Sequence, residues 1–269
     1  KHLIYSKKPY PGLVRLLEHT DILVASDAIA SIFLLLETGS NTSAIADPHP
    51  HYESILSCDG IKKIFDLFQK NISKYSRDRT ALCIGYLFRA RMITDSKMRQ
   101  EVINHLKSLL CDSNNWVKEN SKTALKQLSQ NEENRSEILN DEELKRIEKD
   151  LKKPCNGTEE QKNQIFQKQE NCLLLLSSTL IDLNDNELRK PIISSGIVEN
   201  ILFIFKKGDF SSITRTYSQA FLSLVCPSSN EIKHLIYSKK PYPGLVRLLE
   251  HTDILVASDA IASIFLLLE

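Results

Sequence analysis

Residues 114–128 read NNWVKENSKTALKQL, and this stretch gives the strongest single indication of the fold. A polar start at Asn114 and Asn115 leads into an apolar helical pattern that runs from Val117 to Leu128. Upstream, residues 102–110 also place apolar side chains at helical spacing, and a polar break at 112–115 separates the two segments. The pattern predicts a pair of helices joined by a short turn.

The same plan recurs along the chain. Residues 61–68 and 197–205 follow Gly60 and Gly196, and each has apolar residues spaced along one helical face. A polar break and a longer apolar helix come next, at 76–88 and 213–225. Such a helix pair exposes a wide apolar stripe that it cannot bury alone, so the units must stack. Strand patterns are absent from the sequence.

A second, exact repetition sets the length of the unit. Residues 1–37 recur letter for letter as residues 233–269, an offset of 232. Five units within that offset have about 46 residues each, a length typical of armadillo and HEAT repeats. The identity indicates tandem duplication or assembly from a repeating unit, and it predicts a piece of a longer array. We expect one solenoid, with a partial repeat, four repeats and the duplicate at 1–37, 38–91, 92–139, 140–183, 184–232 and 233–269.

These units resemble armadillo repeats. Residues 114–128, with 131–139 after them, are similar without gaps to the family's third helix and the start of its next repeat. The turn at 194–198 resembles the family's turn between first and second helices, where Gly196 permits a sharp reversal and Asn140 takes the corresponding place in the fourth unit. The resemblance implies an all-α, right-handed superhelix of armadillo type. It is weakest at 38–54 and 152–165, which we expect to be long loops.

Composition narrows the class of protein. The formal net charge is +1, so no global charge favours nucleic acid or an acidic membrane surface. The longest apolar stretch, residues 22–36, is too short and too polar for a membrane span. Six cysteines are scattered without a CxxC pair, as in buried thiols of a reducing compartment. We expect a cytoplasmic protein, with a nuclear location left open, and neither nucleic acid nor a membrane as a partner.

No catalytic motif is present, and we expect no enzyme and no cofactor. The only cluster that resembles metal ligands is His49 and His51 with Cys58 nearby. Without a fourth ligand it is a weak signal, and an extended loop between two units is the preferred interpretation. We therefore expect no metal.

Armadillo solenoids stack their third helices along a concave groove that holds extended peptides. In the nuclear-import adaptors of the family, a Trp and an Asn one helical turn later repeat along this groove. No unit here has that pair, and Ala30, Leu34 and Leu82 suggest an apolar first part of the groove. Trp116 is interpreted as a partly buried residue at the junction of second and third helices. The predicted binding residues are Arg79, Tyr86, Asn120, Thr123, Gln127, Arg215, Gln219 and Ser223.

Three functional interpretations follow. The preferred one is a binding module for a protein or an extended peptide, in which the basic stretch 59–99 could meet an acidic ligand. A structural or filament-forming spacer in a longer repeat protein is the second, and a regulatory arm of an enzyme such as a kinase is the third. Because residues 1–37 open in the tail of a first helix and neither end carries a polar capping repeat, head-to-tail self-association is also expected.

Overall fold

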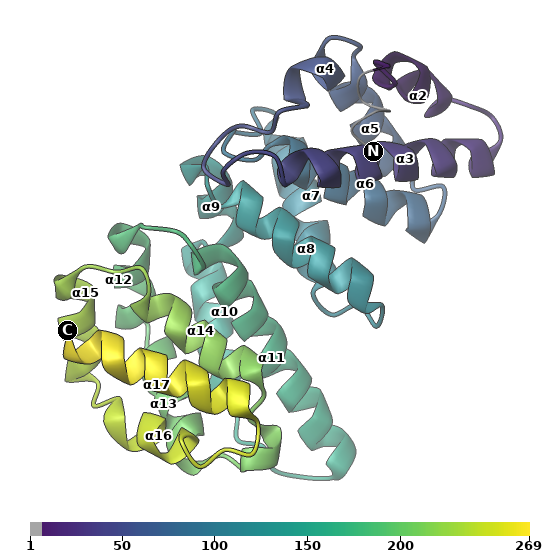
Figure 1. Ribbon diagram of the computed structural model, residues 1–269. Coiled ribbons are helices and arrows are strands. Elements are labelled where there is room, and N and C mark those ends of the chain that lie inside the picture. Colours follow the sequence, from purple (N-terminus) through teal and green to yellow (C-terminus); the bar gives the residue numbers. More distant parts are fainter. Residues whose placement is uncertain (1–6) are drawn as a thin grey trace. The chain divides into compact units, whose positions relative to one another are not determined.

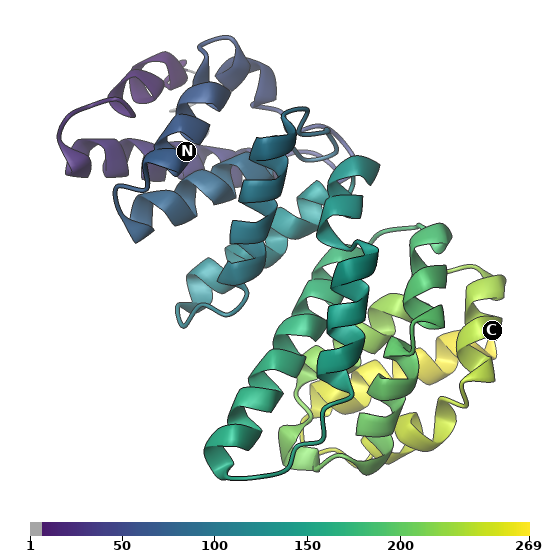
Figure 2. The same ribbon diagram turned by 180° about the vertical axis from the view of Figure 1, so that it is seen from behind.

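The computed structural model describes residues 7–269 (Figures 1 and 2). Throughout this range the secondary structure is helical, without a strand, which confirms the all-α prediction. The first-helix tail predicted for the opening residues lies outside the described range. The chain divides into two compact units, Lys1–Ile138 and Leu139–Glu269, here called unit 1 and unit 2. Their boundary falls within one residue of the predicted repeat boundary at 139/140.

Unit 1 consists of stacked helix groups of the predicted kind. Its third helices lie side by side, with α3 packed on α6 and α6 on α8, and α2, α5 and α7 pack in turn on α3, α6 and α8. The third helices are α3 (Ile22–Ser40), α6 (Lys74–Leu87) and α8 (Asn115–Leu128). The remaining helices are α2 (Tyr10–Leu16), α4 (Tyr52–Leu56), α5 (Gly60–Lys70), α7 (Ser96–Leu109) and α9 (Glu132–Ile138).

Unit 2 repeats the arrangement. Its third helices stack in the order α11, α14, α17, and Figure 1 shows α14 and α17 side by side. Viewed from behind, α10 and α11 also lie against each other (Figure 2). The third helices are α11 (Glu159–Leu180), α14 (Arg215–Val225) and α17 (Ile254–Leu268). The others are α10 (Asp141–Leu151), α12 (Asn186–Ser194), α13 (Ile197–Lys207), η1 (Phe210–Ser212), α15 (Asn230–Ser238) and α16 (Tyr242–Leu248).

The polar breaks between helices supply the N-caps of the third helices. Asp21 accepts a hydrogen bond from the backbone of Leu23, Ser73 from Ser76, and Asn114 from Trp116. Each cap satisfies an amide that the first helical turn leaves free. The breaks therefore fix where each third helix begins, and with it which side chains its first turn presents.

The reversal between first and second helices is made in more than one way. Gly196 has φ 89°, the left-handed conformation that the sequence predicted. The expectation for Asn140 is wrong, because its backbone is extended, with φ −86° and ψ 172°, and its side chain caps α10 by accepting from the Glu143 amide. In the predicted repeat 38–91, which lies in unit 1, Asp59 rather than Gly60 adopts the left-handed conformation, with φ 58°.

Both expected loops are shorter than predicted. Helix α3 continues to Ser40, and α4 already begins at Tyr52. Helix α11 begins at Glu159 rather than at residue 165, because Thr158 and Gln161 form a reciprocal capping box.

The expectation that residues 22–36 are too short and too polar for a membrane span is wrong by length and hydropathy, because α3 continues to Ser40 and is long and apolar enough to cross a membrane. Half of its most apolar window is buried inside unit 1, and the core helix of a protein without membrane contact meets the same criterion.

Candidate binding surface on the third helices

An aromatic cluster joins the three third helices of unit 1. The Phe33 ring of α3 lies 5.3 Å from the Tyr86 ring of α6 and 5.3 Å from the Trp116 ring of α8, edge to face in both pairs. Such pairs stabilise beyond the area they bury. Phe33 and Tyr86 are buried, whereas Trp116 in the first turn of α8 is 37% exposed. The ring of Trp116 therefore belongs both to the core and to the surface.

Arg79 lies on this surface between two aromatic rings. Its guanidinium carbon is 3.4 Å from the centroid of the Tyr75 ring and 4.8 Å from that of Trp116. Stacking of this kind holds the guanidinium plane in a fixed orientation. Within the described range, no carboxylate or other acceptor is paired with Arg79 by an ion pair or hydrogen bond. We call Tyr75, Arg79 and Trp116 the Arg79 cluster.

Two predicted binding residues support the cluster from beneath. The Tyr86 hydroxyl donates to Oδ1 of Asn120 at 2.9 Å, and Nδ2 of Asn120 donates to the Trp116 carbonyl oxygen at 2.8 Å. Burial raises the pKa of Tyr86, so its hydroxyl keeps the proton that it donates. Since both side chains are buried and satisfied, they position α8 against α6 and offer little to a ligand.

The other predicted binding residues of unit 1 are only partly accessible to a ligand. Thr123 is half-buried, and its hydroxyl donates to the Glu119 carbonyl. Gln127 is buried, and its Nε2 lies 3.3 Å from Oγ of Ser40. The expectation of an apolar groove is wrong at Leu82, which is buried, whereas Leu34 is exposed.

In unit 2 the predicted residues lie along α14. Arg215 is exposed, with Nε 3.6 Å from Oδ2 of Asp259, and Gln219 is half-buried. Ser223 is buried; its hydroxyl donates to the Ala220 carbonyl, and its own carbonyl accepts from Arg189. Ser223 is therefore a structural residue. Five of the eight predicted residues thus lie in unit 1 and three in unit 2.

The basic stretch 59–99 is largely engaged in structure. Arg89 is buried, and its guanidinium donates to the carbonyl oxygens of Ser40 and Asp47 at 2.9 and 2.8 Å, which fixes the loop after α3. Lys63 and Arg91 pair with Glu18 and Glu53. Arg79 differs from these residues because its guanidinium lies over two aromatic rings and forms no ion pair or hydrogen bond with another described residue.

The histidine cluster also has a structural explanation. Nε2 of His49 donates to the Leu36 carbonyl at 2.9 Å, and its Nδ1 accepts from the His51 amide at 3.1 Å. Nδ1 of His51 lies 2.6 Å from the Tyr10 hydroxyl. Among residues 7–269, no group of three or more His, Cys, Asp or Glu side chains is placed to hold a metal ion. The six cysteines are free thiols.

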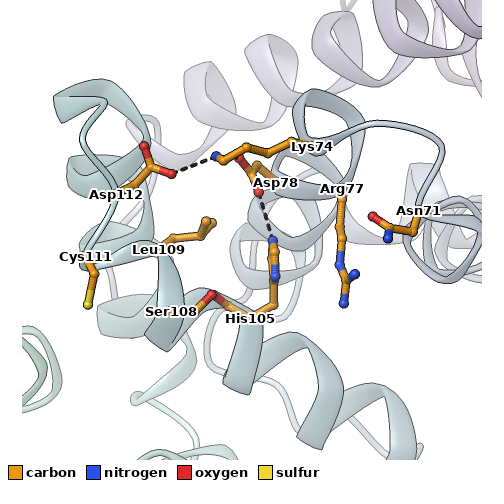
Figure 3. Close-up of a pocket in the computed structure, with 9 residues that line it drawn as sticks. All are labelled: Asn71, Lys74, Arg77, Asp78, His105, Ser108, Leu109, Cys111 and Asp112. Atoms are coloured by element: carbon orange, nitrogen blue, oxygen red, sulfur yellow. Dashed lines mark hydrogen bonds and ion pairs between the residues drawn. The ribbon is translucent and has the colours of Figure 1, made fainter.

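A pocket of about 440 Å³ lies between the start of α6 and the end of α7 (Figure 3). There Lys74 Nζ is 2.5 Å from Asp78 and 2.7 Å from Asp112, and His105 Nε2 is 2.9 Å from Asp78. Burial raises the pKa of Asp78, but the hydrogen bonds from His105 and Lys74 outweigh it and hold this pKa below its ordinary value. Lys74, Asp78, His105 and Asp112 satisfy one another and join α6 to α7, whereas Arg77, which also lines the pocket, lies over the Phe68 ring with its Nε unpaired among the described residues.

Comparison with known proteins supports the architecture. The family model of the non-SMC mitotic condensation complex subunit 1 matches residues 68–180, less than half of the chain. No curated protein matches the sequence.

Solved structures resemble nearly the whole chain. A designed armadillo repeat protein in complex with the peptide (KR)4 is 15% identical, with 96% of this chain and 99% of that chain covered and a TM-score of 0.58. A computationally designed armadillo repeat protein for modular peptide recognition is 16% identical, with 96% and 99% covered and a TM-score of 0.53. An engineered protein is 14% identical, with 96% and 98% covered and a TM-score of 0.56. At these identities the likeness establishes the fold, and the chain is an armadillo-like helical solenoid.

Proposed function

We propose that the chain is a non-catalytic binding module, and that the Arg79 cluster of unit 1 binds an extended, acidic peptide segment. The armadillo-like fold often serves as a protein-binding scaffold, and two of the similar designed proteins are described by their peptide recognition. The observation that carries the proposal is the Arg79 guanidinium, which is stacked on two rings but has no carboxylate partner within the described residues.

The side chains of the Arg79 cluster indicate which kind of peptide would bind. A guanidinium presents planar donors that match a carboxylate in a bidentate pair. The stack on Tyr75 already restricts the Arg79 side chain, so less rotamer entropy is lost on binding. The exposed ring of Trp116 can cover an apolar side chain next to the carboxylate. The preferred ligand is therefore an extended segment with an acidic residue beside an apolar one.

This preference is opposite to that of the designed protein whose structure holds (KR)4. A Lys-rich peptide would bring like charge to Arg79, which disfavours binding. A cytoplasmic location is part of the proposal, since free thiols persist in a reducing compartment.

The test is a fluorescence-anisotropy titration of the full chain with two labelled peptides, one of alternating Glu and Leu and one of (KR)4. We expect the acidic peptide to bind more tightly and its affinity to fall with added salt. Arg79→Ala should weaken it by about tenfold or more, since a hydrogen bond to a charged group contributes roughly 1.5–3 kcal/mol. Arg79→Lys keeps the charge without the planar fork and should retain only part of the affinity.

The matched control is Arg15→Ala, which removes an exposed arginine of unit 1 from α2. It lowers the net charge equally and should leave the affinity unchanged. Equal weakening by Arg15→Ala and Arg79→Ala would reduce the effect to net charge and contradict the assignment. Tighter binding of (KR)4 than of the acidic peptide would contradict the proposed ligand class.

The match of residues 68–180 to a condensation complex subunit favours a second candidate, a structural subunit that holds other proteins in a complex. Such a subunit can contact its partner proteins through any part of its surface. Loss of peptide binding in Arg79→Ala supports the first candidate, whereas an acidic peptide that fails to bind the unchanged chain favours the second.

A further inference from the structure

A second arginine of α6 has an unused guanidinium, on a different side of the helix from Arg79. Arg77 is half-buried, and its guanidinium carbon lies 4.9 Å from the centroid of the Phe68 ring. No residue within 7–269 forms an ion pair or hydrogen bond with this guanidinium, and its Nε is a buried donor without a partner. Residues two apart on a helix do not face each other. Arg77 is therefore a second stacked and unpaired cation, at a place distinct from the Arg79 cluster.

The Phe68 ring keeps the Arg77 side chain in place. It is buried near the end of α5, and the His105 ring of α7 packs against it edge to face at 5.5 Å. His105 is also hydrogen-bonded to Oδ1 of Asp78, whose Oδ2 accepts from Lys74. Figure 3 shows the Arg77 side chain extending past His105, with its guanidinium outside this network. The acidic residue next to Arg77 in α6 is thus already paired with other side chains.

Arg77 lines a second pocket, whose polar groups are mostly able to donate hydrogen bonds. This pocket, here called the Arg77 pocket, has a volume of about 530 Å³ and is lined by Phe68, Gln69, Asn71, Arg77, Lys97 and Glu101. Gln69 and Asn71 are exposed, and their side chains make no hydrogen bond with another described residue. Of the described residues that line the pocket, Glu101 alone is acidic. It lies 3.9 Å from Nζ of Lys97, whose side chain is 66% exposed, and so long and exposed an ion pair is weak.

This combination of groups suits a phosphate monoester better than a carboxylate. A phosphate monoester carries about 1.5–2 negative charges and three strong acceptor oxygens at neutral pH. The Arg77 pocket offers two cations against one carboxylate, and the amides of Gln69 and Asn71 add neutral donors. A guanidinium can bind phosphate through two parallel hydrogen bonds. Because the stack on Phe68 already restricts Arg77, less rotamer entropy is lost on binding.

A hollow next to the Arg77 pocket favours a polypeptide as the carrier of the phosphate. It has a volume of about 590 Å³ and shares Gln69 and Lys97 with the Arg77 pocket. Apolar surface is contributed to it by Tyr52, Leu56, Phe65 and Met98, and Leu56 is 49% exposed. A residue that flanks a phosphorylated side chain can place an apolar group there, which an inorganic ion cannot do. The two adjacent surfaces, one cationic and one apolar, are complementary to a phosphorylated segment with an apolar neighbour.

We propose that the Arg77 pocket binds a phosphorylated serine or threonine of a partner protein. Arg77 and Lys97 bind the phosphate, and the neighbouring hollow takes an apolar residue of the same segment. The site is separate from the Arg79 cluster, and it does not depend on whether that cluster binds an acidic peptide. Phosphorylation of the partner supplies the charge that the Arg77 pocket recognises, so it controls the interaction.

The test compares two labelled peptides in fluorescence-anisotropy titrations with the full chain. Both consist of Ala and Leu around a central residue, which is phosphoserine in one and Glu in the other. We expect the phosphopeptide to bind at least about tenfold more tightly, because the phosphate adds charge and acceptor oxygens. The Glu peptide reports on the Arg79 cluster, so the ratio of the two affinities isolates the Arg77 pocket.

Arg77→Met should remove this preference. Met keeps an apolar side chain over the Phe68 ring without the guanidinium, and circular dichroism would establish that the variant is folded. Its affinity for the phosphopeptide should fall about tenfold, toward that for the Glu peptide. Arg77→Lys should retain part of the affinity, and Lys97→Met should lower it roughly twofold to fivefold, because Lys97 is exposed. Arg15→Met is the matched control at an exposed arginine of α2 and should leave the preference unchanged.

Four results would overturn the proposal. Equal affinities of the two peptides for the unchanged chain would show that the pocket does not recognise a phosphate. A preference that persists in Arg77→Met but disappears in Arg79→Met would assign the phosphate to the Arg79 cluster. Inorganic phosphate that displaces the phosphopeptide at concentrations near the peptide's own Kd would make the free ion the ligand. Arg77-dependent sedimentation with vesicles that contain a phosphoinositide, without binding of the phosphopeptide, would assign the site to a membrane surface.

Discussion

The hydroxyl of Tyr86 donates a 2.9 Å hydrogen bond to Oδ1 of Asn120, and this buried bond joins α6 to α8 directly beneath Trp116. Asn120 also binds the first turn of α8, since its Nδ2 donates a hydrogen bond to the Trp116 carbonyl oxygen. The position of Trp116, and so the aromatic platform for Arg79, depends on this pair.

Removing the Tyr86 hydroxyl should destabilise unit 1. Tyr86→Phe leaves Oδ1 of Asn120 buried without its partner, which costs about 1–3 kcal/mol in the free energy of unfolding. Urea denaturation followed by circular dichroism measures the loss. Tyr75→Phe is the matched control, because Tyr75 is exposed, and it should change the free energy by less than about 0.5 kcal/mol.

A double-mutant cycle with Asn120→Ala tests whether the bond itself is responsible. We expect the double variant to lose less than the sum of the two single losses, by roughly 0.5–3 kcal/mol. Strict additivity would show that Tyr86 and Asn120 stabilise the unit independently and would contradict the proposed connection.

The duplicated segment allows one substitution to be compared in two contexts. Phe33→Ala removes a ring from the core of unit 1 and should cost about 3–5 kcal/mol. Phe265→Ala changes the same residue of the same sequence where the ring is 61% exposed, and should cost less than about 0.5 kcal/mol. Urea denaturation at low protein concentration, where self-association does not contribute, gives both values. Equal costs would mean that the face of α17 is not exposed in solution.

The fold was largely predictable from local pattern. Apolar periodicity and polar breaks depend only on residues close together in the sequence, and the duplication indicated the length of the repeat. Together they predicted stacked helix pairs. The start of α11 was missed although its signal is present, because Thr158 and Gln161 have the spacing of a capping box. The proximity of Tyr75 and Arg79 was also accessible, since side chains four residues apart meet on a helix.

The binding surface was less predictable, because exposure depends on how one helix meets the next. Helical spacing placed Tyr86 and Asn120 on a groove, but the register between α6 and α8 decides that they bond to each other. The contact of Phe33 with Trp116 spans two helices distant in sequence, so no local pattern contains it.

His49 should make unit 1 less stable in mild acid. Burial lowers its pKa from 6.5 to about 4, and its Nδ1 accepts from the His51 amide, so protonation would remove that bond. Between these pH values the unfolded chain binds a proton that the folded chain does not. The free energy of unfolding should therefore fall as pH decreases from 6.5 to about 4, by at most about 1.4 kcal/mol per pH unit.

The comparison that isolates this effect is His49→Gln, whose amide can donate to the Leu36 carbonyl and accept from the His51 amide. Urea denaturation at several pH values should show a flatter dependence for this variant than for the unchanged chain. His234→Gln replaces an exposed histidine and should preserve the full dependence. Identical slopes for the unchanged chain and His49→Gln would show that another group is responsible.

Arg189 should be among the most important single residues of unit 2. It is fully buried, and its guanidinium donates to the carbonyl oxygens of Leu183 and Asp185, both at 2.8 Å, and to those of Ser223 and Leu224 at 3.0 and 3.2 Å. Ser223 and Leu224 lie in the last turn of α14, whose carbonyls have no partner within the helix. Arg189→Met retains much of the volume but leaves these carbonyls unsatisfied, so we expect a loss of about 3 kcal/mol or more in the free energy of unfolding.

Lys190→Met is the neighbouring control, because Lys190 makes surface ion pairs with Glu187 and Glu231, which contribute about 0–1 kcal/mol. Urea denaturation distinguishes the two, and similar small losses for both would contradict the capping role of Arg189.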